Sequence, residues 1–271
     1  MDAFLAQLKL WGINPEVAIT DGSPLYKEAL KEHWEGMAHQ LCIFHVIKDV
    51  NKLILDGVRK VKNKLKRLGN RGRKRRRGRP CKGKHKKSNK RMSRREQAKF
   101  IWKNQHLVVK KDENLTDEDR DALESIFEMA PELKLFRTFN EQFYALFEKG
   151  ITKEEARRRR ERMVSDIDYQ SNPYLAKALR KFSKEKFEKM ITFMDYENCE
   201  RTNNHVERNN RGFRLVQKTR YKRRRPKTIE TAIWLDVLRR WRRHPLYDKS
   251  GAVKLRVLPT VTGACEQKEA A

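Results

Sequence analysis

The chain has 271 residues, with 65 Lys and Arg against 36 Asp and Glu, and its formal net charge is +29. It has no uncharged apolar run near the roughly 18 residues that span a bilayer, which excludes a transmembrane protein. The start, MDAFLAQLKLWG, lacks the basic and apolar regions of a secretory signal. Four scattered cysteines without a Cys-x-x-Cys pair argue against a disulfide scaffold, so we expect an intracellular, cytoplasmic protein.

The positive charge is concentrated in one window. Residues 57–95 contain 21 Lys or Arg and no acid, whereas the other 232 residues carry a net charge of only +8. A field this concentrated implies a polyanionic partner, and nucleic acid is favoured over a membrane surface because the window has few bulky apolar residues.

The first part of the chain predicts an α/β alternation of helices and strands. A short helix over 4–11 precedes a buried strand over 17–20. Ser23 and Pro24 then form an N-cap and first turn for a helix over 25–34. A second strand is expected over 37–44, and a long helix over 45–68 runs into the basic window.

The centre of the basic window has no apolar periodicity, so we expect it to be disordered without a ligand. The run Arg77-Gly78-Arg79-Pro80 resembles the core of an AT-hook, which lies in a narrow A·T minor groove. Plain electrostatic binding to phosphates is the alternative. The candidate DNA-binding residues of this window are Arg73, Arg75, Arg76, Arg77 and Arg79.

The pattern from Ser93 to Met190 is helical. Thr116 and Thr152 are each followed three residues later by an acid, which predicts helix N-caps. An apolar stripe over 133–147 is expected to be a core face. The basic run 157–160 could contact phosphate, although a solvated helix face is the favoured interpretation.

Two acids stand out by their context. Asp21 follows the first strand, at the rim of a sheet where ligands of α/β proteins collect. Glu207 lies in a predicted helix among Asn and Arg residues, a setting that suits a divalent metal near a nucleic-acid backbone. Taken singly, Asp21 could be a turn-capping acid, and Glu207 a surface acid paired with Arg211.

Three short segments, in this order along the chain, resemble the DDE transposases of insertion sequences. They are Ile19-Thr20-Asp21-Gly22, the Cys42-Ile43-Phe44-His45 signature expected on the next strand, and Thr202-Asn203-Asn204-x-x-Glu207-Arg208. The likeness is to Mutator-like and related bacterial transposases. It implies a mixed α/β, mostly helical chain: a partial RNase H-like fold interrupted by a large all-α insertion.

The resemblance also implies a division of the chain into five parts. Residues 1–56 would begin the RNase H-like core and 57–95 would be the basic DNA-binding segment. Residues 96–198 would form the helical insertion, 199–243 the rest of the core with the Glu207 helix, and 244–271 a tail.

The function that the resemblance implies is metal-dependent DNA cleavage and strand transfer in transposition. Asp21 and Glu207 would be catalytic ligands of Mg²⁺ or Mn²⁺, and the DNA substrates would be the element ends and the target. We also expect a homodimer and association with the nucleoid. Beyond the basic window, the cations expected to position DNA phosphates are Arg208, Arg211, Arg223 and Arg224.

The chain departs from the family pattern at its start. The first catalytic acid of the family lies on an upstream strand, and Asp2 precedes a helix rather than ending a strand, so it is not assigned that role. We therefore expect a chain that begins partway through the fold, with an upstream fragment of the same transposase as a further partner. The alternatives are a non-catalytic basic DNA-binding protein and an inactive transposase remnant.

Three interpretations of Cys42 and His45 stay open. They could form half of a zinc site with Cys199 and His205, although the Cys199–His205 gap is wider than usual in such sites. In the family interpretation Cys42 packs under the sheet and His45 lies near the active site. A core cysteine followed by a histidine at a helix start is the plainer alternative.

Overall fold

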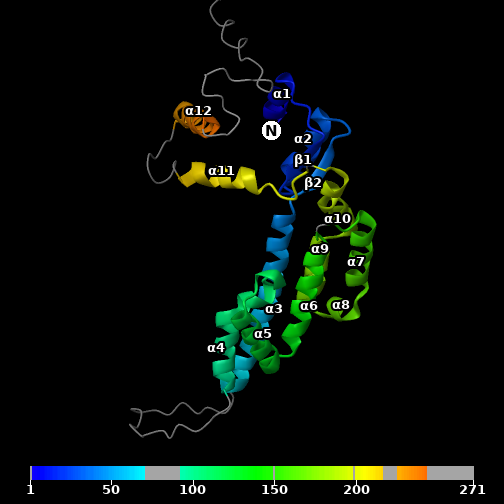
Figure 1. Ribbon diagram of the computed structural model, residues 1–271, viewed down its shortest axis with the longest axis vertical. Helices are drawn as coiled ribbons and strands as arrows, with labels where there is room; N and C mark the ends of the chain where they lie inside the picture. The colour runs from blue at the N-terminus through cyan, green and yellow to red at the C-terminus, as the bar shows by residue number, and fades with distance from the viewer. Residues whose placement is uncertain (1, 71–91, 149, 198, 216–224, 243–271) are drawn as a thin grey trace, which may run out of the picture. The chain divides into compact units, whose positions relative to one another are not determined.

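The computed structural model describes residues 2–70, 92–148, 150–197, 199–215 and 225–242 (Figure 1). The chain divides into two compact units, which we call the sheet unit (1–42 with 200–271) and the helical unit (43–199). The five-part division expected from the sequence stays a prediction. No helix in the described ranges has the length and apolar character needed to cross a membrane.

The sheet unit contains the α/β alternation that the sequence predicts. Helix α1 (Asp2–Leu10) precedes strand β1 (Val17–Thr20), and helix α2 (Pro24–His33) connects β1 to strand β2 (Ala38–Leu41). The two strands are parallel, in register from Val17↔Ala38 to Thr20↔Leu41. The chain is thus mixed α/β and mostly helical, whereas an RNase H-like arrangement stays a prediction.

Helices α1 and α2 bury a small apolar cluster in this unit. Leu5 of α1 packs with Ala29, Leu30 and Trp34, and Ala18 of β1 lies against the same cluster. The Trp34 indole N–H donates to the Ile13 carbonyl oxygen at 3.1 Å, which ties the chain after α1 to the end of α2. This cluster supports the β–α–β arrangement that holds Asp21.

Two further helices belong to the sheet unit. Helix α11 (Asn204–Leu215) carries Glu207, and helix α12 (Pro226–Arg242) follows it along the chain. Large apolar side chains of α12 are exposed, including Trp234 and Leu238.

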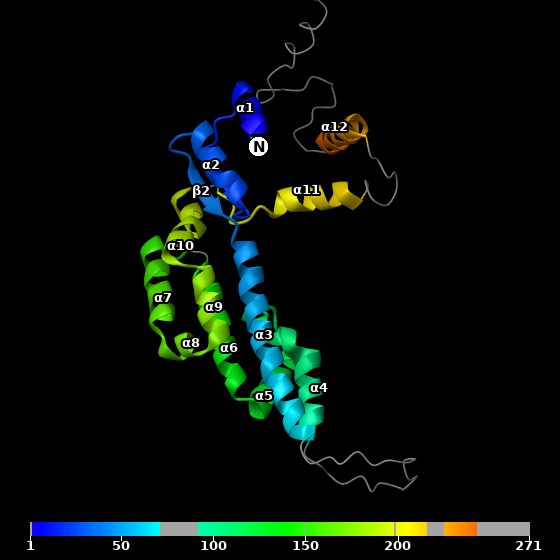
Figure 2. The ribbon, with the colours of Figure 1, turned by 180° about the vertical axis from the view of Figure 1, so that it is seen from behind.

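The helical unit confirms the helices predicted after Ser93 and is organised around one long helix (Figure 2). Helix α3 (Ile43–Asn70) packs against α4 (Arg94–Asn104), α6 (Glu132–Ala145) and α9 (Pro173–Lys181). The other helices of the unit are α5 (Asp117–Met129), α7 (Lys153–Ser165), α8 (Ile167–Ser171) and α10 (Lys184–Met190). Short 3₁₀ turns span Gln105–Val109, Asp112–Asn114 and Thr192–Asp195.

Aromatic side chains fill the core of the helical unit. The predicted stripe is confirmed, because Phe136, Phe139 and Phe143 of α6 are buried. The Phe139 ring meets Tyr169 edge-on with centroids 5.0 Å apart, and Phe143 lies 5.0 Å from Phe182. Such contacts add to the stabilisation from apolar burial.

Side-chain caps define several helix starts in this unit. Thr116 accepts a hydrogen bond from the Asp119 N–H while the Asp119 carboxylate accepts from the Thr116 N–H, a complete capping box. Thr152 accepts from the Glu155 N–H at 3.2 Å. Both predicted N-caps are confirmed.

The boundary between the second strand and the long helix differs from the sequence prediction. The strand expected over 37–44 ends at Leu41, and α3 begins at Ile43. Ile43 favours a strand in sequence, but it is buried on the helix. Burial on the apolar face of α3 outweighs this local preference. The centre of the basic window, residues 71–91, lies outside the described residues.

Candidate active site

Asp21 lies on an exposed turn at the carboxyl end of β1. Its Oδ1 accepts a hydrogen bond from the Ser23 backbone N–H at 3.0 Å, which confirms the turn-capping interpretation. Ser23 occupies the N-cap position of α2, but its side chain makes no capping hydrogen bond. The Asp21 side chain is exposed despite its turn bond, so the carboxylate is accessible to a ligand.

The turn after Asp21 depends on glycine. Gly22 has φ of +82°, a conformation that costs other residues strain. A Cβ atom at this position would also lie 2.6 Å from Leu41 Cδ1, at the end of the neighbouring strand. The Asp-Gly sequence therefore fixes where the carboxylate leaves the sheet.

A hydrogen-bonded pair beneath the turn was missed by the sequence analysis. The buried Thr20 hydroxyl lies 2.7 Å from His39 Nε2 and accepts from the Gly22 N–H at 3.3 Å. Thr20, the residue directly before Asp21, thus connects the turn to the second strand. The sequence does place a threonine directly before the acid. Its hydrogen bond with His39 could not be predicted, because it depends on the register of the two strands.

The Cys-x-x-His segment does not lie on a strand, which corrects the sequence prediction. Cys42 follows β2, is fully buried, and donates its backbone N–H to the Thr20 carbonyl oxygen at 2.8 Å. His45 lies in the first turn of α3, with its ring 6.0 Å from Phe44. This geometry matches the plainer interpretation of a core cysteine and a helix-start histidine. A role for His45 near the active site stays a prediction.

Glu207 lies in the first turn of α11, where it is half-buried. Its backbone N–H donates to the Asn203 carbonyl oxygen at 3.1 Å, which starts the helix at the Asn-Asn pair. The remaining signature residues, Thr202 and Asn204, are also half-buried. Asp21 and Glu207 both belong to the sheet unit.

The Asn203 side chain leaves an oxygen acceptor unused. Its Oδ1 atom is buried and has no hydrogen-bond partner among the described residues. A buried amide oxygen without a partner is costly unless a ligand or water engages it. Asn203 is thus a candidate oxygen donor one helical turn before Glu207.

The donor chemistry of this unit fits a hard divalent cation. Mg²⁺ and Mn²⁺ prefer carboxylate and carbonyl oxygens, which Asp21, Glu207 and Asn203 supply. In the described ranges, no three His, Cys, Asp or Glu side chains gather into a metal-binding group. The zinc alternative gains no support from Cys199, which is half-buried, and the His205 side chain lies outside the described residues.

The predicted DNA-binding arginines are only partly described. Arg208 and Arg211 of α11 are exposed, as phosphate contacts require. The remaining candidates lie outside the described residues: Arg73, Arg75, Arg76, Arg77, Arg79, Arg223 and Arg224.

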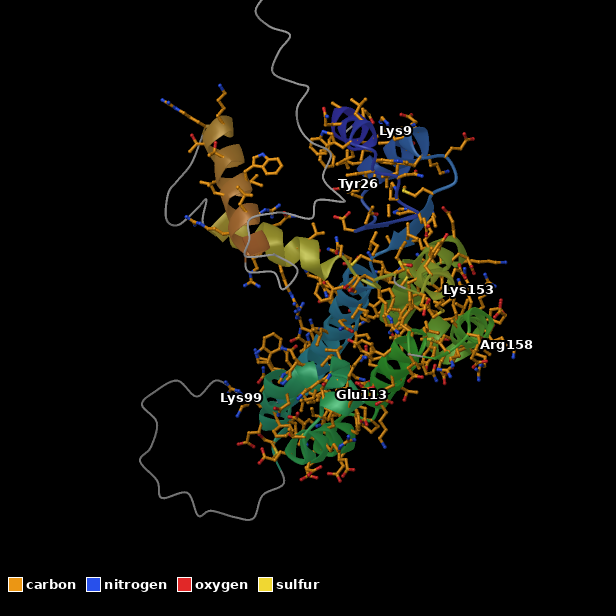
Figure 3. All side chains as sticks on the ribbon, turned by 45° about the horizontal axis from the view of Figure 1, so that its top comes forward. Lys9, Tyr26, Lys99, Glu113, Lys153 and Arg158 are labelled. Atoms are coloured by element: carbon orange, nitrogen blue, oxygen red, sulfur yellow. The ribbon has the colours of Figure 1, made fainter. Side chains whose placement is uncertain are left out.

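The basic run on α7 agrees only in part with the predicted solvated helix face, because three of its four arginines also donate hydrogen bonds within the helical unit. Arg157 donates two hydrogen bonds to the Glu188 carboxylate, at 2.9 and 2.7 Å, which hold the pKa of Glu188 below its usual range. Arg159 contacts Glu155, and Arg160 donates to the Phe182 carbonyl oxygen at 3.0 Å. Arg158 is exposed (Figure 3).

Comparison with known protein families gives a match over most of the chain. The model of the ISL3 family of DDE transposases, described as a transposase, matches residues 1–232. The Mutator-like part of the predicted resemblance is not confirmed by this match. No curated protein and no solved structure matches the chain.

Proposed function

This chain belongs to the ISL3 family of DDE transposases, and from that premise we propose that Asp21 and Glu207 bind the metal ion used for DNA strand cleavage and transfer. The family implies a function in DNA transposition with DNA as the partner. The observation that carries the proposal is the exposed Asp21 carboxylate, held by the Gly22 turn in the same unit as Glu207.

Each residue of the site has a distinct part in the proposal. Asp21 and Glu207 would supply anionic oxygen ligands, and Asn203 Oδ1 would supply a neutral oxygen that binds the metal or accepts a hydrogen bond from its water. Thr20 and His39 hold the end of β1 so that Asp21 keeps its position. Arg208 and Arg211 orient DNA through its phosphates, a largely sequence-independent interaction.

The chemistry requires charge stabilisation on a phosphodiester. Mg²⁺ or Mn²⁺, when bound, would polarise the scissile phosphate and lower the pKa of the attacking water or 3′-hydroxyl. Hydrolysis would release a 3′-OH at the element end. That oxygen would then attack a target phosphate in line and displace the 3′ oxygen of the target strand.

Mg²⁺-dependent nicking of terminal-repeat DNA tests this proposal. We expect Asp21→Asn and Glu207→Gln each to lower the rate by about 10³-fold, because each removes several kcal/mol of charge stabilisation. The matched controls Asp2→Asn and Glu28→Gln alter exposed acids of the same unit and should cut as the unmodified chain does.

The assay is run on this chain and on a version extended upstream. The second candidate function is DNA binding without catalysis, which the basic window and the exposed Arg208 and Arg211 would support equally well. Nicking by neither version would contradict the enzymatic proposal and favour this candidate. Nicking that survives both substitutions would assign the chemistry to other residues.

A further inference from the structure

The helical unit has a pocket on the face of α3 that the transposition proposal does not use. The pocket encloses ≈ 1010 Å³ between α3, α6 and the start of α9. Its apolar floor includes Gly57, Val61 and Phe136. We call it the α3 pocket, and define its rim by the polar and aromatic residues Asp56, Arg59, Lys60, Asn63, Lys64, Arg67, Glu132, Asn172 and Tyr174.

The rim of the α3 pocket is positively charged. Arg59, Lys60, Lys64 and Arg67 are all exposed, against only two acids, Asp56 and Glu132. Lys60, Lys64 and Arg67 follow one another at helical spacing, so they form a row about 10 Å long on one side of α3. The row presents cations to solvent along a surface that is already hollowed.

The contacts within the rim leave much of this charge unneutralised. Arg59 contacts Asp56 at 2.6 Å, and Lys64 lies 3.5 Å from Glu132. Both pairs are exposed, and exposed pairs are weak enough for a phosphate to replace the acid. Lys60 and Arg67 form no ion pair with another described residue. Lys60 instead lies over the Tyr174 ring, 5.6 Å from its centroid.

The neighbouring face of α3 adds to the same positive field. Burial, together with nearby Lys66 and Arg59, lowers the pKa of Lys62. Crowded cations repel one another, so a bound polyanion would relieve this repulsion. In the sequence, α3 leads directly into residues 71–91, of which 13 are Lys or Arg.

The floor of the pocket is rigid enough to keep this row in place. A Cβ atom at Gly57 would lie 2.4 Å from the Phe136 ring, so glycine permits close packing of α6 on α3. Phe136 is itself buried. The side chains of Lys60, Lys64 and Arg67 therefore extend from a packed helix and not from a loop.

We propose that the α3 pocket binds the sugar-phosphate backbone of duplex DNA through Lys60, Lys64 and Arg67. The identity of the nucleic acid rests on the transposition function proposed above. The observations specific to the pocket are its hollowed surface, its row of exposed cations and its continuity in sequence with the basic window. Contacts of this kind carry no base specificity and depend strongly on salt.

The test is the salt dependence of binding to a random-sequence duplex, measured without divalent metal by fluorescence anisotropy. The full chain is compared with the triple variant Lys60→Gln, Lys64→Gln and Arg67→Gln. For duplex DNA each lost phosphate contact lowers the slope of log K against log salt by about 0.9, so we expect a decrease of about 2.7. The control variant Lys99→Gln, Lys134→Gln and Lys186→Gln removes the same charge from exposed positions of the helical unit. Figure 3 labels one of these positions, Lys99.

The control separates a local contact from a change in net charge. We expect its slope to decrease by less than one contact, because its lysines lie outside the α3 pocket. Equal decreases in the two triple variants would overturn the proposal. The proposal names duplex DNA. It would therefore also be overturned if the pocket triple variant bound a single-stranded oligonucleotide of the same length more weakly but bound the duplex as the unmodified chain does.

Lysine acetylation of the unmodified chain, read by mass spectrometry, keeps the test decisive if the triple variant does not fold. Duplex DNA should protect Lys60 and Lys64 several-fold and leave Lys99, Lys134 and Lys186 modified at their original rates. Unprotected Lys60 and Lys64 would contradict the proposal. Neither measurement involves strand cleavage, so failure here leaves the proposed roles of Asp21 and Glu207 standing.

Discussion

The two units of the chain differ in how they use their side chains. The helical unit buries a continuous set of aromatic rings and engages even its basic run in internal contacts. The sheet unit has a short two-stranded sheet, a small apolar cluster, and exposed groups such as Asp21 and Arg208. We therefore expect substitutions in the helical unit to change mainly the stability of the chain. Substitutions in the sheet unit should change mainly its chemistry.

A substitution in the aromatic core should give the largest change in stability. Phe139→Ala removes a fully buried ring that contacts Tyr169 and Phe182, and we expect it to lower the free energy of unfolding by about 3–5 kcal/mol. Urea denaturation followed by circular dichroism measures the loss. Phe44→Ala, at an exposed phenylalanine, should cost far less, and equal losses would refute the distinction between core and surface.

The helix caps of the two units should differ by a smaller amount in their contribution to stability. Thr116→Ala removes the capping box of α5, and we expect a loss of about 1 kcal/mol in the free energy of unfolding. Ser23→Ala is the counterpart in the sheet unit and should have nearly no effect, because the Ser23 side chain makes no cap bond. Thermal melting of the two variants distinguishes them. A larger effect at Ser23 would reverse the comparison.

The smallest expected effect is the pH dependence of the Arg157–Glu188 pair. Hydrogen bonds from Arg157 lower the pKa of Glu188, so the folded state binds this proton less readily than the unfolded state. The resulting stability is present above the ordinary glutamate pKa near 4.5 and is lost as pH falls through the lower folded value. Glu188→Gln should therefore weaken the fall in melting temperature between about pH 5 and 3. An unchanged acid profile would contradict the assignment.

The sequence predicted features that depend on local patterns. The Thr116 cap, the apolar stripe of α6 and the Asp21-Gly22 turn follow from helical spacing, capping chemistry and glycine conformation. The end of β2 was misplaced because Ile43 favours a strand locally, while its burial on α3 decides the outcome.

Features that depend on distant parts of the chain were not predictable in this way. The Thr20–His39 hydrogen bond requires the strand register, and the Arg157–Glu188 pair joins residues 31 positions apart. The α3 pocket likewise requires the packing of α6 and α9 on α3. In the candidate site, the sequence could nominate Asp21 and Glu207 as acids, but not the supporting contacts around them.

Metal binding tests the central claim that Asp21 and Glu207 hold one ion. Mn²⁺ can be titrated into the full chain and the free ion followed by electron paramagnetic resonance. We expect Asp21→Asn and Glu207→Gln each to weaken binding at least tenfold and the double variant to be little worse than either, because the two residues share a ligand. Unchanged Mn²⁺ affinity in both single variants would contradict the account.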